Sequence, residues 1–179
     1  MFSIRQKKNT THDKFGFTLV ETLVYLGLAV ILLSGIVQAI VTLTAAYRNV
    51  KTARDIESSA IAVMDRIVRD TRDATSINTA QSTFNLNPGI LYLNTYNASS
   101  TAITDKYYVA NQRVMLSENG VLLGPLTSAD VAVSSLIFRS YSTSTSNAVK
   151  IELTLTSAST SRVYITKNFY GTAVLRGSY

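Results

Sequence analysis

The sequence predicts an α+β fold in which one long N-terminal helix packs on a C-terminal antiparallel β-sheet. Three observations predict it. No formal charge occurs from Thr22 to Tyr47, neither proline nor glycine occurs from Ile36 to Asn87, and short alternating runs of apolar and polar residues follow Asn87-Pro88-Gly89. Long stretches with helical periodicity are typical of helices, and short alternating runs are typical of strands.

The first part of the expected helix is long and apolar enough to cross a membrane. Thr22–Tyr47 holds 26 residues without a charge. A helix of that length spans roughly 39 Å, which exceeds a hydrocarbon core of ~30 Å. A cleaved secretory signal has a shorter apolar core of about 7–15 residues, followed by a small-residue cleavage site. We therefore expect a single membrane-spanning helix.

The second part of the expected helix is amphipathic. Apolar residues recur at helical spacing and predict a stripe that packs on a sheet; they are Val50, Ala53, Ala60, Val63 and Ile67, broadened by Ile56, Met64 and Val68. The other face carries charge pairs four residues apart, each worth a few tenths of a kcal/mol; they are Asp65 with Arg69, Arg66 with Asp70, and Arg69 with Asp73. A helix from about Thr18 to Ala74 would be roughly 85 Å long.

The C-terminal part predicts an antiparallel sheet. The expected strands are Ile90–Tyr96, Tyr107–Leu116, Val131–Tyr141, Val149–Thr156 and Arg162–Tyr170. Asn119-Gly120, between two apolar runs, is a strong hairpin signal. The Ser/Thr-rich tracts Ser140–Ser146 and Ser157–Ser161 are expected to be loops, and the second is expected to join two antiparallel strands.

Composition argues against enzymatic chemistry. The chain has no cysteine, and its single histidine is His12. A serine triad and the common zinc sites therefore lack parts, so we expect no catalytic residue, no cofactor and no metal. The net charge is +6, of which residues 1–16 contribute half. The remaining +3 is a weak field, and nucleic acid is not an expected partner.

A motif at the start of the apolar segment is the most specific feature of the chain. It is Lys14-Phe15-Gly16-Phe17-Thr18-Leu19-Val20-Glu21, and Glu21 is the only charged side chain from Phe17 to Tyr47. A carboxylate in a membrane helix costs about 2.5–3.5 kcal/mol on insertion scales, so one found there usually has a partner and a function. The motif resembles the signal of type IV pilins and of the pseudopilins of type II secretion systems.

The resemblance implies a processing route. A prepilin peptidase would cut between Gly16 and Phe17 and methylate the new amino group of Phe17. Residues 1–16 would then be a cytoplasmic leader, 17–47 a transmembrane and filament-core helix, and 48–179 an extracytoplasmic domain. The protein would be held in the cytoplasmic (inner) membrane and then enter a filament. The count of Lys and Arg on the two flanks permits this orientation without dictating it.

The resemblance also assigns roles to individual residues. Glu21 would be the counter-ion of the amino terminus of a neighbouring subunit, because pairing removes two separately costly charges from the lipid. Other pilins or pseudopilins would be its partners in a helical filament. The core of that filament would be packed by Leu19, Val20, Leu23, Val24 and Leu26.

A weaker resemblance concerns the rest of the chain. The run Met64–Ala74 and the closing segment Phe169–Arg176 are similar to the J-type minor pseudopilins and related minor pilins. Two alternatives stay open: a binding module at the filament tip that presents tyrosines to a surface ligand or DNA, and a plain signal-anchored membrane protein. For the tyrosines Tyr92, Tyr96, Tyr107 and Tyr108 we expect packing in the core.

Overall fold

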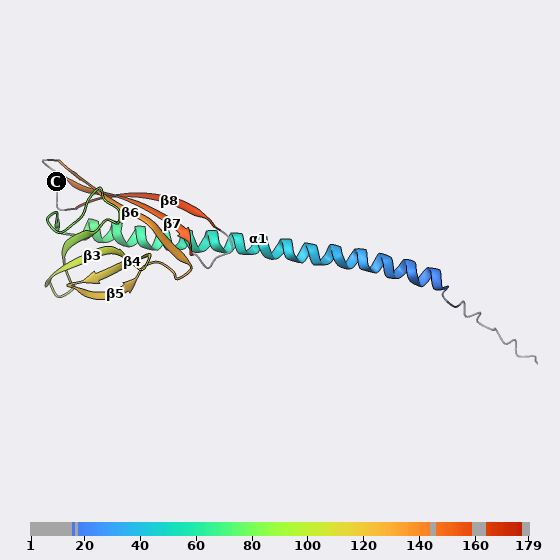
Figure 1. The fold of residues 1–179 in the computed structure, drawn as a ribbon. Helices are drawn as coiled ribbons and strands as arrows, with labels where there is room; N and C mark the ends of the chain where they lie inside the picture. The colour runs from blue at the N-terminus through green and yellow to red at the C-terminus, as the bar shows by residue number, and fades with distance from the viewer. Residues whose placement is uncertain (1–15, 17, 144–145, 159–163, 177–179) are drawn as a thin grey trace, which may run out of the picture. The chain divides into compact units, whose positions relative to one another are not determined.

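The computed structural model of the chain describes residues 16, 18–143, 146–158 and 164–176 (Figure 1). The chain divides into two compact units, Met1–Ala45 and Ala46–Tyr179. Helix α1 (Leu19–Asp73) runs from the first into the second, and all strands belong to the second. The α+β fold, with one long N-terminal helix packed on antiparallel β-structure, is confirmed.

Helix α1 begins and ends within one residue of the predicted bounds. Its 55 residues contain Gly27 and Gly35 but no proline, so no residue removes a backbone donor from the helix. Glu21 lies in the first turn and Arg72 in the last. Both charges are placed favourably relative to the helix dipole.

The strands form two antiparallel sheets instead of one. The first has the order β1-β2-β3-β4-β5. Its strands are β1 (Ser76–Ile77), β2 (Leu91–Tyr96), β3 (Ala102–Ala110), β4 (Arg113–Glu118) and β5 (Val121–Pro125). The second has the order β6-β7-β8. Its strands are β6 (Val131–Ser142), β7 (Asn147–Ser157) and β8 (Thr166–Val174).

Two-residue turns connect β3 to β4 and β4 to β5. The predicted hairpin at Asn119-Gly120 is confirmed, with φ of 48° and 83°. The expected single strand Tyr107–Leu116 is wrong, because the chain reverses at Asn111-Gln112, whose φ values are 50° and 57°. Both turns have the positive φ pair of type I′, whose twist matches that of the flanking strands.

One hydrophobic core of the described residues joins α1 to both sheets. The helix contributes the predicted stripe, of which Ile56, Ala60, Val63 and Ile67 are at most 1 % exposed. The sheets contribute every second residue along their strands, on the face turned toward the core. These include Leu91, Leu93, Tyr107, Val114, Leu116, Leu136, Phe138, Ile151, Leu153 and Leu155. At about 1.5–3 kcal/mol per fully buried large side chain, this burial is the main stabilising term of the second unit.

Several finer expectations need correction. Val50 is 52 % exposed, so the buried stripe begins later in the helix. Of the three predicted charge pairs only Arg66–Asp70 is an ion pair, at 2.7 Å between Nε and Oδ2. Strand β6 continues through Ser142, into a tract expected to be a loop. The second tract extends beyond the described residues, but the strands that it joins, β7 and β8, pair antiparallel as expected.

Candidate functional site

The start of α1 is fixed by a local cap. The side-chain Oγ1 of Thr18 accepts a hydrogen bond of 3.2 Å from the backbone N–H of Glu21. The carbonyl of Thr18 accepts a second bond, of 3.1 Å, from the N–H of Thr22. Thr at the N-cap with Glu three residues later is the spacing of a capping box. The motif thus contains a helix-start signal, Thr18 with Glu21, in addition to the resemblance described for it.

Glu21 has a partner inside its own chain. The hydroxyl of Tyr25 donates a hydrogen bond of 3.1 Å to Oε1 of Glu21, one turn further along the helix. Glu21 is half-buried, whereas its apolar neighbours are exposed. Within the chain the carboxylate is stabilised by this hydroxyl and by the positive end of the helix dipole. Neither carries a full positive charge, and among the described residues Glu21 forms no ion pair.

The five residues expected to pack the filament core share one face. With about 100° between successive residues, they cover an arc of about 160° on the helix, and Glu21 and Tyr25 lie outside it. All five are exposed by at least half: Leu19 79 %, Val20 71 %, Leu23 64 %, Val24 52 % and Leu26 67 %. The structure therefore brings Glu21 together with Tyr25 and places the apolar face on another side.

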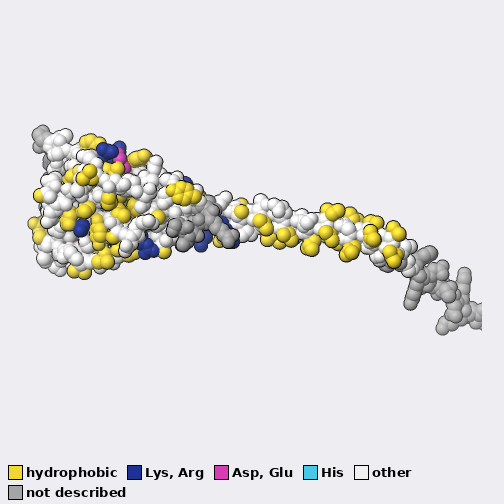
Figure 2. Space-filling model, in the orientation of Figure 1, with side chains coloured by type: hydrophobic (Ala, Val, Ile, Leu, Met, Phe, Trp, Pro, Cys, Tyr) yellow, Lys and Arg dark blue, Asp and Glu magenta, His cyan; other side chains and the backbone are white. Residues whose placement is uncertain are grey.

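The apolar stretch of α1 is not covered by any other part of the chain that the structure describes. By length and composition α1 contains a segment that could cross a membrane, and none of that segment is buried. Apolar side chains follow this part of the helix in Figure 2. Such a surface is unfavourable in water at about 25 cal/mol per Å². Lipid, or packing against other helices, would remove this cost.

The expected cleavage point lies between Gly16 and Phe17, just before α1. Gly16 precedes the helix, is exposed, and a Cβ built on it would meet no atom within 4 Å. The described structure therefore has room for a larger side chain at position 16, and packing does not explain the glycine. Phe17, the expected site of methylation, lies outside the described residues.

A polar cluster that extends from the core to the surface ties α1 to the first sheet. The hydroxyl of Tyr107, fully buried on β3, donates to Oδ2 of Asp70, which also pairs with Arg66. Burial, followed by the hydrogen bond to Asp70, raises the pKa of the Tyr107 hydroxyl well above its usual range. The phenol is thus a neutral donor, and it fixes the rotation of α1 against β3. Asp105, also on β3, lies close to this cluster.

The remaining tyrosines do not lie where the sequence placed them. Tyr107 is in the core, but Tyr92 and Tyr108 are half-buried on the outer face of the first sheet and Tyr96 is 61 % exposed. The expectation of core packing is therefore wrong for three of the four. The reason is strand parity: Tyr107 and Tyr108 are adjacent on β3 and must point to opposite faces.

Comparison with known proteins adds no assignment. No protein-family model, no curated protein and no solved structure matches this chain.

Proposed function

We propose that the chain is a minor pilin or minor pseudopilin, a structural subunit of a type IV pilus, type II secretion or competence filament. The observation that carries this proposal is Glu21, the one charged side chain in the apolar first part of α1, placed five residues after Gly16. In this proposal the protein catalyses nothing. It is a substrate of a prepilin peptidase and a partner of other pilins.

The chemistry of Glu21 supports an assembly role. A membrane carboxylate without an ionic partner is costly. The Tyr25 hydroxyl offsets part of that cost while the subunit is alone in the membrane, because it donates to Oε1 at 3.1 Å. In the filament, the methylated amino group of a neighbour's Phe17 would add the missing positive charge. A buried pair of this kind fixes register more than it adds net stability.

The apolar face of α1 supports the same proposal. Its leucines and valines are exposed in the single chain, and helix bundles bury such faces. Because Glu21 lies on a different side, the neighbour that provides the amino group would pack on a different side from the one that covers the leucines. One subunit would then contact several neighbours, as helical assembly requires.

Intact mass after co-expression with a prepilin peptidase tests the proposal. We expect a mature chain that begins at Phe17 and carries one added methyl group. A Gly16→Leu variant should stay full length, since a bulky side chain at the cut cannot thread a narrow protease site. Gly27→Ala is the matched control, because Gly27 also has no atom near its Cβ position, and it should be processed normally. If a positive-control pilin is cut but the wild-type chain still begins at Met1, the pilin proposal is wrong. The chain would then be a signal-anchored membrane protein.

A further inference from the structure

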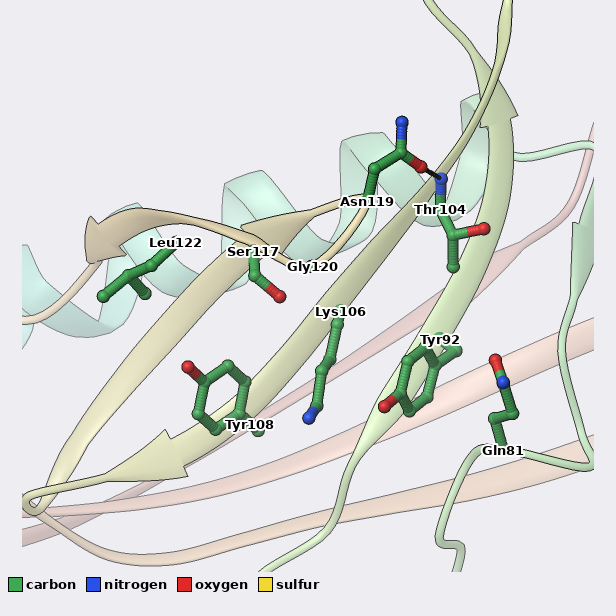
Figure 3. Close-up of a pocket in the computed structure, with 9 residues that line it drawn as sticks. All are labelled: Gln81, Tyr92, Thr104, Lys106, Tyr108, Ser117, Asn119, Gly120 and Leu122. Atoms are coloured by element: carbon green, nitrogen blue, oxygen red, sulfur yellow. Dashed lines mark hydrogen bonds between the residues drawn. The ribbon is translucent and has the colours of Figure 1, made fainter.

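The outer face of the first sheet carries a groove that the proposed filament role does not use. It has a volume of about 470 Å³, and we call it the tyrosine–lysine groove. Its lining includes Tyr92, Lys106, Tyr108, Ser117, Asn119 and Gln81 (Figure 3). Tyr92, Lys106 and Ser117 form one cross-strand row, because Tyr92 pairs with Lys106 and Lys106 pairs with Ser117.

The cation in this groove is held in place by two aromatic rings. Nζ of Lys106 lies 4.6 Å from the ring centroid of Tyr108 and 5.4 Å from that of Tyr92. Figure 3 shows the lysine side chain between the two rings. Contacts of this kind contribute about 0.5–1 kcal/mol each at exposed sites. A lysine restrained in this way loses less side-chain entropy when it binds an anion, which favours affinity.

The lining selects the chemistry of a ligand. Lys106 is its only charged residue, and the other polar groups are hydroxyls and amides. Nucleic acid fits poorly, because single-strand sites combine stacking aromatics with a positively charged groove along the backbone. An extended peptide added as a strand also fits poorly. The groove lies mainly over the inner strands β2, β3 and β4, and it reaches the edge strand β5 at Leu122. Strand addition needs a free edge, whereas Lys106 and the two tyrosine rings of the groove lie on inner strands.

We propose that the tyrosine–lysine groove binds a saccharide that bears a carboxylate. The carboxylate would pair with Lys106, the apolar face of a sugar ring would lie on Tyr108 or Tyr92, and its hydroxyls would bond to the amides and hydroxyls of the lining. A few placed polar groups among aromatic side chains are typical of small-molecule sites. The proposal does not depend on the filament role.

Binding to the full-length chain tests this site. The protein is kept in a zwitterionic detergent without a sugar headgroup, and the probes are trigalacturonate, alginate trimers and sialyllactose. The neutral controls are maltotriose and lactose, and (dT)15 represents nucleic acid. Because the chain has ten tyrosines and no tryptophan, tyrosine fluorescence and calorimetry report binding. We expect at least one acidic saccharide to bind at least tenfold more tightly than its neutral counterpart.

Variants locate the binding on this groove. Lys106→Gln and Tyr108→Thr keep strand-compatible side chains and should each weaken binding at least tenfold. Lys150→Gln is the matched control, because Lys150 also lies over one tyrosine, Tyr170, at 5.6 Å on the other sheet, and it should bind as the wild type does. If Tyr108→Thr destabilises the domain, the result for Lys106→Gln decides the test. The proposal is overturned if no acidic saccharide binds, if neutral sugars bind equally well, if (dT)15 binds instead, or if Lys106→Gln has no effect.

Discussion

Asp105 offers a direct test of the contact between α1 and the first sheet. It is only 6 % exposed, and its cross-strand partner is another acid, Glu118. Burial is the largest cause of a raised pKa at Asp105. The negative charges of Asp70 and Glu118 raise this pKa further, and the positive charge of Arg66 lowers it. Together they raise the pKa of Asp105 from 3.8 to about 6. Asp105→Asn removes the charge and keeps the shape of the side chain.

The sign of the effect follows from this raised pKa. A folded-state pKa above the unfolded value of about 3.9 means that the folded chain binds the proton more tightly. The stabilisation from Asp105 is therefore present below about pH 4 and is lost as pH rises through about 6. The rise of this pKa to about 6 corresponds to at most about 3 kcal/mol, which solvent screening reduces. With the remaining solvent contact, we expect Asp105→Asn to stabilise the domain by about 1–3 kcal/mol at pH 8 and by almost nothing at pH 4.

Urea unfolding of the full chain in detergent, followed by tyrosine fluorescence at both pH values, measures this difference. Asp130→Asn is the control, because Asp130 is exposed, and it should change stability by less than about 0.5 kcal/mol at either pH. A loss of stability for Asp105→Asn at pH 8, or an equal effect at both pH values, would show that the carboxylate is not held against α1 as described.

Three further outcomes are expected. Ile67→Ala truncates a fully buried side chain and should lower the free energy of unfolding by about 2–5 kcal/mol in the same urea titration. Ile61 is 59 % exposed on the same helix, so the control Ile61→Ala should lower it by less than about 0.5 kcal/mol. Gly89→Ala would place a Cβ 3.0 Å from a ring carbon of Phe138 and beside strand backbone, and should destabilise by about 1–3 kcal/mol, seen as a lower urea midpoint. Glu21→Ala should leave that midpoint and the peptidase cleavage unchanged but reduce co-assembly with partner pilins at least tenfold in cross-linking. Normal co-assembly of this variant would refute the counter-ion role.

The features that sequence patterns did not predict lie in the strands and have a common physical origin. The turn at Asn111-Gln112 contains no glycine or proline, and the single Asn111 is a weaker turn signal, so the end of β3 was missed. The outer position of Tyr92 and Tyr108 depends on register, and a shift of one residue would exchange the two faces of a strand. The groove could have been anticipated only by pairing β2, β3 and β4 correctly.

The sequence by itself determined the features that depend on near neighbours along the chain. These are the continuous helix, its apolar first part with a single carboxylate, its amphipathic second part, and the hairpin at Asn119-Gly120. Each follows from periodicity or turn chemistry within a few residues. Only the tertiary structure decided the division into two sheets, the contact of Tyr107 with Asp70, the burial of Asp105 beside Glu118, and the capture of Lys106 between two rings. Those features depend on contacts between separate strands, or between a strand and α1, and these contacts are fixed by strand register and by packing of the whole core.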